Sequence, residues 1–308
     1  MGELEEAKAK AAAAYNAAAD YFDHPVSSFW HRFGRQTIER LSLCEGSTVL
    51  DVCCGSGGSA LPAAEVVGPR GKVVAVDLAE RLIQSGEAKA RAKGFGNIEF
   101  RVGDMLALGY PDYSFDVVVC VFGIFFVPDM VAAAKELWRM VRPGGTLALT
   151  TWGPDLFEPA NTAFWEAISE ERPDLLKSFN PWERISTPAG LREMLGKAGI
   201  ANAEIVAEAG SHRLDSPEDW WLVAMGSGYR SALAQLDAAT FARVHERNLA
   251  LLGQCDAITT NVVYSVAKKK SRITLSMPRV VPRNCRRQVE LRQHERLALL
   301  AQETGAQS

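Results

Sequence analysis

Short apolar segments alternate with helical patterns between residues 48 and 151, and no other feature of the sequence restricts the fold as strongly. The apolar segments are rich in Val, Ile and Leu and lie at residues 48–52, 73–76, 98–102, 117–121 and 146–151. Helical patterns separate them, the clearest at residues 79–93 and 130–140. Strands that are apolar on both faces and alternate with helices belong to parallel sheets covered by helices. The alternation therefore predicts an α/β fold.

Helical patterns precede this alternation, and a mixed region follows it. An Ala-rich helix is predicted at residues 3–23 and a second helix at about residues 28–43. One face of the first helix carries Tyr15, Ala18, Ala19 and Phe22. After a Pro- and aromatic-rich insertion, helices are predicted at residues 188–198, 217–236 and 238–252, and strands at 203–209 and 258–266. With these two later strands, the predicted sheet has seven strands.

The composition is that of a globular protein and excludes disordered, fibrous and membrane-spanning classes. Of 308 residues, 47% are hydrophobic and 23% are charged, and the mean hydropathy is −0.05. No run of about 18 apolar residues would span a bilayer, and the first ten residues lack a secretory pattern. The six cysteines are scattered, and Cys53-Cys54 has no partner pair at zinc-ligand spacing. We therefore expect a cytoplasmic protein without a metal site.

Charge is distributed unevenly along the chain. From residue 268 to residue 308, ten Lys and Arg residues stand against three acidic residues, a local net charge of +7. The whole chain carries −3, so the 267 residues before this segment carry −10. The segment also lacks a clear hydrophobic period. We therefore expect a basic, disordered tail at residues 268–308.

Glycines and carboxylates follow the predicted strands where each strand ends. Asp51-Val52-Cys53-Cys54-Gly55-Ser56-Gly57 joins the first strand to a helix, Asp77 ends the second strand, and Gly103-Asp104 follows the third. Ligands of parallel α/β sheets bind at the carboxyl ends of the strands, and glycines there let the backbone approach a ligand. Taken alone, Gly55-x-Gly57-x-x-Ala60 also fits the dinucleotide pattern GxGxxA, which is a weak signal.

Three of these carboxylates favour one class of nucleoside ligand. Asp51 precedes the glycines, where it suits an ammonium group and would repel a pyrophosphate. Asp77 lies where a carboxylate reaches a ribose diol, and Asp104 can accept from an exocyclic amine. Asp77 could instead cap the next helix, Asp104 could stabilise a turn, and Asp116 is interpreted as structural because it precedes its strand. An ammonium, a ribose and an adenine amine describe S-adenosylmethionine better than NAD.

Five motifs occur in a fixed order between residues 45 and 152. They are Val49-Leu50-Asp51-Val52-Cys53-Cys54-Gly55-Ser56-Gly57, Val76-Asp77, Gly103-Asp104-Met105, Phe115-Asp116-Val117-Val118 and Arg142-Pro143-Gly144-Gly145. In this order they resemble the motifs of class I S-adenosylmethionine-dependent methyltransferases. The segment Phe122-Gly123-Ile124-Phe125-Phe126-Val127-Pro128-Asp129 is similar to that of the ubiquinone/menaquinone-type and small-molecule group. The resemblance implies a Rossmann-like, doubly wound, seven-stranded, mostly parallel sheet with an antiparallel C-terminal strand, plus N-terminal helices and a helical insertion.

The resemblance also implies a set of cofactor-binding residues. They are Asp51, Cys53, Gly55, Ser56, Gly57, Asp77, Leu78, Asp104, Met105 and Val121. Ser56 and Gly57 would lie at the methionine end of the cofactor and Asp77 at its ribose. Cys53 replaces the usual first glycine of the motif, so we expect a slightly altered turn. Phe125-Phe126 replaces residues that are typically polar in quinone methyltransferases.

His31 and Tyr21 are the candidate catalytic residues. The resemblance implies that the N-terminal helices fold over the mouth of the cofactor site, and histidine can take a proton near neutral pH. Methyl transfer needs little beyond alignment, because the sulfonium is already activated. The Tyr264-x-x-x-Lys268 pair is typical of short-chain dehydrogenases, but in a predicted strand its members lie about 13 Å apart. An apolar acceptor pocket is expected among Trp30, Phe33, Phe125, Phe126, Trp152, Trp165, Trp182, Trp220 and Trp221.

The sequence divides into four predicted parts. Residues 1–44 would form a helical lid, 45–152 the cofactor-binding core, 153–267 a substrate cap with the remaining strands, and 268–308 the tail. The predicted function is S-adenosylmethionine-dependent O-, N- or C-methylation of a small, largely apolar molecule by a monomer or homodimer. The alternatives are an RNA methyltransferase that uses the basic tail and a non-catalytic nucleotide-cofactor-binding protein. The tail adjoins an acidic body, and the tail itself lacks interleaved aromatic residues that would stack on bases. Both features argue against nucleic acid as the substrate.

Overall fold

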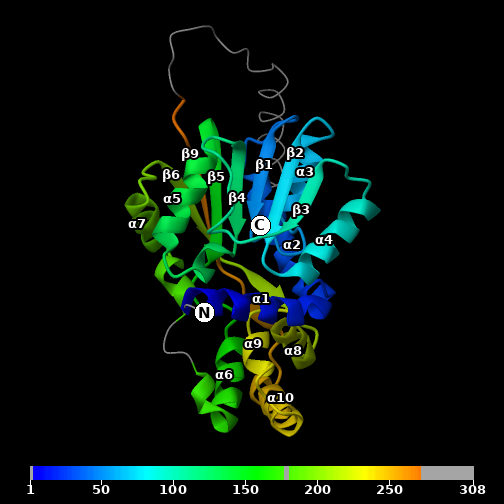
Figure 1. The fold of residues 1–308 in the computed structure, drawn as a ribbon. Helices are drawn as coiled ribbons and strands as arrows, with labels where there is room; N and C mark the ends of the chain where they lie inside the picture. Colours follow the sequence, from blue (N-terminus) through cyan, green and yellow to red (C-terminus); the bar gives the residue numbers. More distant parts are fainter. Residues whose placement is uncertain (1–2, 177–179, 272–308) are drawn as a thin grey trace, which may run out of the picture.

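A seven-stranded sheet with helices on both faces forms the body of the molecule (Figure 1). The structure is a computed structural model, and it describes residues 3–176 and 180–271. The strands of this sheet are β1 (Thr48–Val52), β2 (Lys72–Asp77), β3 (Ile98–Val102), β4 (Phe115–Val121), β5 (Val141–Trp152), β6 (Ala203–Glu208) and β9 (Val262–Lys268). A small second sheet pairs β7 (Ser211–Arg213) with β8 (Ala257–Thr259).

Helices precede, separate and follow the strands. The longer ones are α1 (Glu3–Phe22), α2 (Phe29–Glu39), α3 (Ala60–Val67), α4 (Glu80–Ala92), α5 (Met130–Met140), α6 (Ala160–Glu171), α7 (Pro188–Lys197), α8 (Pro217–Met225) and α10 (Ala238–Leu252). Shorter turns of helix are α9 (Arg230–Leu233), η1 (Pro25–Ser27), η2 (Ile124–Phe126), η3 (Pro173–Leu175) and η4 (Pro181–Ile185). Helices α6, α8, α9 and α10 gather beyond the end of the sheet that α1 crosses (Figure 1).

The strand order is β3-β2-β1-β4-β5-β9-β6. Strands β1 to β5 are mutually parallel, whereas β9 is antiparallel to both of its neighbours, β5 and β6. The order reverses between β1 and β4, which is where open α/β sheets bind their ligands. This confirms the predicted fold, including the antiparallel strand at the C-terminal end of the described chain.

Several predicted element boundaries are wrong. The helix predicted at residues 217–236 is two helices, because Gly226 lets the chain turn against α1: a Cβ there would lie 2.6 Å from the carbonyl oxygen of Tyr21. The strand predicted at residues 258–266 is split between β8 and β9. Strand β5 begins at Val141, five residues early, with a register shift against β4. The second helix ends at Glu39, before the predicted residue 43.

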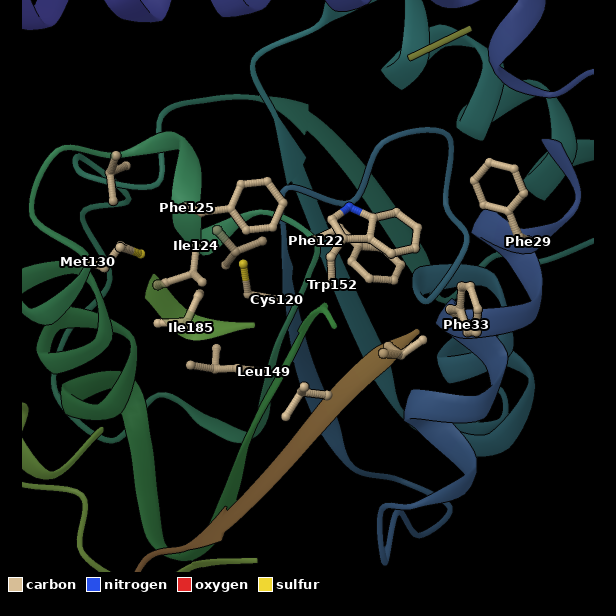
Figure 2. Packing of buried hydrophobic residues seen from close by; sticks show 14 of the residues in the cluster. Phe29, Phe33, Cys120, Phe122, Ile124, Phe125, Met130, Leu149, Trp152 and Ile185 are labelled. Carbon is tan, nitrogen blue, oxygen red and sulfur yellow. The ribbon is translucent and has the colours of Figure 1, made fainter. Parts of the chain in front are cut away.

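An aromatic core fixes α2 against the ends of the central strands. Trp152 at the end of β5 stacks on Phe122 after β4, with ring centroids 3.8 Å apart. Phe29 and Phe33 of α2 meet the edges of these rings (Figure 2). Such aromatic pairs add about 0.5–1.5 kcal/mol each beyond the apolar area that they bury. The core thereby holds the start of α2 beside the glycine-rich turn that follows β1.

Helix α1 crosses the edge of the sheet at which the parallel strands end (Figure 1). It contacts α4, α8 and α9. Asn16 accepts from the backbone N–H of Arg81 at 2.9 Å, so α1 supplies a partner for a free N–H at the start of α4. The sheet edge is therefore roofed by the first helix of the chain.

The start of the predicted basic tail is ordered. Lys268 ends β9, and the Lys269 Nζ atom donates to the carbonyl oxygens of Trp138 (2.7 Å) and Val141 (2.9 Å). The rest of the predicted tail, from residue 272, lies outside the described residues. The division of the chain into lid, core, cap and tail stays a prediction.

Candidate functional site

A cavity opens beneath α1 at the carboxyl ends of β1, β2 and β4. Its empty space is about 1080 Å³ when the open solvent at its mouth is included. The walls come from the glycine-rich turn, the end of β2, the loop after β3 and the end of β4. The predicted residues on these walls are His31, Cys53, Gly55, Asp77, Leu78, Asp104, Met105 and Val121.

The glycine-rich turn has three residues in the left-handed region. Gly55 has φ +53° and Gly57 φ +94°, and Cys53 has φ +58°, which costs a side chain that carries a Cβ. The turn therefore keeps a glycine-like backbone although the first glycine is replaced. The Cys53 side chain fits because Gly123, just after the neighbouring strand β4, has no side chain: a Cβ on Gly123 would lie 2.4 Å from the Cβ of Cys53.

Asp77 holds this turn in place from the end of β2. Its carboxylate accepts from the backbone N–H of Gly55 (2.9 Å) and of Ala79 (2.9 Å). Burial raises the pKa of Asp77, and the bonds to the backbone of Ala79, Gly55 and Leu78 oppose the rise. The helix cap considered from the sequence is not formed: the N-cap residue of α4 is Ala79, without a side-chain cap, and the bond from Ala79 to Asp77 is a turn bond just before the helix. The same carboxylate lines the cavity, so the turn bonds and ligand contact are compatible.

We expect Asp77→Ala to weaken S-adenosylmethionine binding by about 10- to 100-fold, because it removes a carboxylate acceptor and loosens the Gly55 turn. Titration calorimetry measures the effect. Asp116→Asn is the matched control: Asp116 bonds Thr48 and Arg142 at the opposite end of the sheet and should leave the affinity unchanged. Equal affinities of Asp77→Ala and the unsubstituted protein would mean that Asp77 only supports the local backbone turn.

Asp104 meets the roof of the cavity. One carboxylate oxygen accepts from the backbone N–H of Leu106 at 2.9 Å, which is the turn considered from the sequence. The other lies 2.6 Å from Nζ of Lys8 on α1. The hydrogen bond to Asp104, and a second to Glu5, raise the pKa of Lys8. Lys8 was not predicted as a site residue, and its contact joins the roof to the wall at which Asp104 and Met105 lie.

Asp51, Ser56 and Gly57 are not on the cavity wall. Asp51 is 1% exposed and accepts from the hydroxyl of Ser59 at 2.6 Å, while its other oxygen, Oδ1, has no hydrogen-bond partner in the part of the chain that the structure describes. Burial raises the pKa of Asp51 to about 7, partly offset by the Ser59 bond. Ser59 itself lines the cavity. Asp51 thus lies behind Ser59, so the side chain of Ser59 separates it from the cavity in which an ammonium group was expected to contact it.

The two candidate catalytic residues are placed differently. His31, near the start of α2, lines the cavity, and its Nε2 atom lies 2.9 Å from Oδ1 of Asp23. Tyr21 does not line the cavity and packs against the main core. The tyrosine that does line it is Tyr15, and burial, then the charges of Asp77 and Cys53, raise the pKa of its hydroxyl.

Aromatic side chains line the same cavity as the carboxylates. Besides Tyr15 they are Phe22, Trp30, Phe122 and Phe126, and Phe126 is 45% exposed. Of the nine aromatic residues expected around an acceptor pocket, only Trp30 and Phe126 reach this cavity. Five are buried in the core, namely Phe33, Phe125, Trp152, Trp220 and Trp221. Trp165 and Trp182 are half-buried against that core.

The residues present fit S-adenosylmethionine. The turn is shaped by left-handed residues, carboxylates stand at the ends of two strands, and Oδ1 of Asp51 behind Ser59 is a buried acceptor without a partner among the described residues. Across residues 3–176 and 180–271, no three His, Cys, Asp or Glu side chains gather as metal ligands would. Among the helices described, none has the length and apolarity that a bilayer crossing requires.

Sheet topology, glycine turn and strand-end carboxylates together define a methyltransferase of the S-adenosylmethionine-dependent class. The ubiE/COQ5 methyltransferase family matches residues 5–166. Demethylmenaquinone methyltransferase of Geobacillus kaustophilus is 34% identical over 65% of this chain and 86% of that protein. The enzyme of the same name in Anoxybacillus flavithermus is 33% identical over 61% and 85%. The chain belongs to the ubiE/COQ5 methyltransferase family and uses S-adenosylmethionine.

Solved structures agree with the sheet topology. The YcgJ protein of Bacillus subtilis aligns with a TM-score of 0.52 and 18% identity, covering 78% of this chain and 99% of that one. This likeness concerns the fold alone.

Proposed function

We propose that this methyltransferase acts on a small, largely apolar, aromatic acceptor that lies against Trp30, Phe122 and Phe126. The observation that carries the proposal is one cavity lined by two unlike groups of residues. Asp77, Asp104 and the glycine turn form its polar lining, which we call the polar wall, and Trp30, Phe122 and Phe126 form its aromatic lining, which we call the apolar wall. Aromatic rings favour flat, apolar ligands.

The polar wall is the proposed cofactor side. Asp77 with Leu78 would hold the ribose, Asp104 with Met105 the adenine, and the backbone of Cys53 and Gly55 the methionine part, beside Val121. Asp51, Ser56 and Gly57 would act from behind this wall, Asp51 through the hydroxyl of Ser59. When bound, the cofactor supplies a methyl group on a positively charged sulfur, which an acceptor displaces in line.

The chain's own contribution is alignment and exclusion of water. Helix α1 presents Lys8, Ala11, Ala12 and Tyr15 to the cavity, four residues on one helical face. Fixing an acceptor in line with the methyl carbon supplies much of the rate acceleration, and a roof of apolar residues keeps water from competing.

The relatives are named for a menaquinone precursor, so a quinol is one acceptor of this kind. In this chain Phe126 lines the cavity and Phe125 is buried in the core, at positions where polar residues are typical of the quinone enzymes. An aromatic acceptor less polar than a quinol fits this wall. An RNA acceptor would depend on residues after 271, outside the described residues, and Lys8 on the cavity wall is paired with Asp104. Action in the cytoplasm as a monomer or homodimer remains part of the proposal.

A transfer assay tests the proposed acceptor class. The purified full chain is mixed with S-adenosylmethionine carrying a labelled methyl group and with quinols, phenols, aromatic amines, aliphatic amines and a transcript RNA. We expect label only in the aromatic small molecules. Trp30→Ala should raise their KM by about 10-fold, in line with loss of a large buried ring, with cofactor affinity kept. Transfer to RNA, or to aliphatic amines alone, would contradict the proposal.

A further inference from the structure

A cluster of polar side chains that includes the cavity residue His31 surrounds Asp23 in the turn between α1 and η1. Oδ1 of Asp23 lies 2.9 Å from Nε2 of His31, 2.6 Å from Oγ of Ser56 and 2.7 Å from Nζ of Lys89. Oδ2 accepts from Oγ of Ser85 at 2.8 Å. One carboxylate therefore joins the first helical segment, the start of α2, the glycine-rich turn and α4.

Asp23 is ionised in this setting. Burial alone would raise its pKa, but the hydrogen bonds from His31, Lys89 and Ser56 outweigh burial and hold the pKa of Asp23 well below its usual range. An ionised carboxylate only accepts hydrogen bonds. The Nε2 atom of His31 must therefore carry the proton that it shares with Asp23.

This contact fixes the state of the other ring nitrogen. In a neutral imidazole whose Nε2 is protonated, Nδ1 has a free lone pair and can take a proton. Among the described residues, none is hydrogen-bonded to Nδ1 of His31. The side chain of His31 is 41% exposed and lines the same cavity as Trp30, the residue that precedes it on α2.

We propose that Asp23 is a positioning residue that holds His31 as the Nε2–H tautomer, so that Nδ1 acts as the general base toward an acceptor hydroxyl. The inference rests on the proposed function and narrows the acceptor to a hydroxylated aromatic molecule that is protonated at working pH. A carboxylate behind a histidine orients the ring and balances the charge that the ring gains.

Methyl transfer to a hydroxyl oxygen releases one proton, which His31 would take. A lone pair of the acceptor oxygen forms the bond to the methyl carbon, and the carbon–sulfur bond breaks with its electron pair going to sulfur. The hydroxyl proton moves to Nδ1 of His31, which becomes an imidazolium between the cavity and Asp23. The other charged group at Asp23 is Lys89, so the carboxylate then lies between two cations. The proton leaves for solvent through the open mouth of the cavity.

Nitrogen NMR of the imidazole rings tests the tautomer without any acceptor. The chain has five histidines, and His31→Gln identifies the His31 signals by their loss. We expect the Nε2–H tautomer in the unsubstituted protein and a mixture of tautomers in Asp23→Asn. Asp20→Asn is the matched control, because Asp20 pairs α1 with Arg81 of α4 and does not touch His31. A mixed tautomer in the unsubstituted protein would overturn the proposal.

Two phenolic probes test the base. At about pH 8, 2-naphthol keeps its hydroxyl proton, as an ordinary phenol with a pKa of about 10 does, whereas 4-nitrophenol is largely ionised. We expect His31→Gln to lower kcat on 2-naphthol by about 100-fold and Asp23→Asn by about 10-fold, with at most about 3-fold losses on 4-nitrophenol. Asp20→Asn should resemble the unsubstituted protein on both probes.

The outcomes separate this inference from the proposed function. Equal losses on the two probes, or none, would make the Asp23 cluster purely structural and overturn the inference. Transfer to quinol carbon or to aromatic amines but to neither phenol would overturn the inference and leave the proposed acceptor class standing. Cofactor binding without transfer to any aromatic acceptor would overturn the proposed function itself.

Discussion

Substituting Gly34 by Ala should lower the free energy of unfolding by about 2–3 kcal/mol, because the new methyl group has no space. Gly34 lies in α2 against the glycine-rich turn. A Cβ on it would lie 2.4 Å from the carbonyl carbon and oxygen of Gly58 and 2.7 Å from the amide nitrogen of Ser59. All three are backbone atoms, so no side-chain rotation relieves the contact. Thermal unfolding should show a midpoint lower by roughly 5–10 °C.

Gly196→Ala in α7 is the control for the helical change itself. No heavy atom lies within 4 Å of a Cβ at that position, and replacing an exposed helical glycine by alanine stabilises by about 0.5–1 kcal/mol. The two substitutions should therefore shift the midpoint in opposite directions. Gly34→Ala should also weaken cofactor binding, since α2 can move away only by leaving the turn. A stability equal to that of the unsubstituted protein would mean that α2 does not contact this turn.

The fold could be predicted from the local sequence pattern because most strands and helices have a recognisable hydrophobic period of their own. Continuous apolar strands, glycines after β1 and carboxylates after β2 and β3 are short-range features, and the rules of parallel sheets bring their ends to one edge. The wrong boundaries have long-range causes. The break after α8 exists because Gly226 meets Tyr21, 205 positions earlier in the chain, and no local signal distinguishes that glycine from one inside a helix.

The residues of the candidate site could also be predicted where they depend on local pattern, and not where they depend on long-range contacts. Asp77 and Asp104 reach the cavity as their strand ends require, whereas Ser56 turns away because Asp23 and Lys89 bind its hydroxyl. Lys8 and Asp23 could not be found from the sequence, since their partners lie far along the chain and depend on how α1 docks. The sequence did carry a signal for Tyr15, which shares with Phe22 the helical face that α1 turns to the cavity.

Two ion pairs tie the helix that roofs the cavity to the rest of the site. Lys8 of α1 pairs with Asp104, and Asp23, just beyond the helix, pairs with Lys89. The four side chains are only 18 to 27% exposed, so neither pair is a solvent-screened surface contact. Asp23 also bonds His31, so one carboxylate both fastens the roof and orients the histidine that lines the cavity.

Asp51 should make the stability of the ligand-free protein depend on pH. Its pKa is raised to about 7 by burial, against about 3.9 in an unfolded chain. Below about pH 4 the group is protonated in both states and has no effect. As pH rises through this window the unfolded state loses its proton first, so unfolding is favoured, until above pH 7 the full penalty of a few kcal/mol is present.

Asp51→Asn should remove this penalty. We expect denaturant unfolding at about pH 4 to give equal stabilities for the variant and the unsubstituted protein, and at about pH 8 to show the variant more stable by on the order of 2–4 kcal/mol. Saturating S-adenosylmethionine should shrink or reverse the gap, because a cationic ligand compensates the carboxylate and not the amide. A gap that stays constant between pH 4 and pH 8 would show that Asp51 is paired in the folded protein, and the proposed role behind Ser59 would then fail.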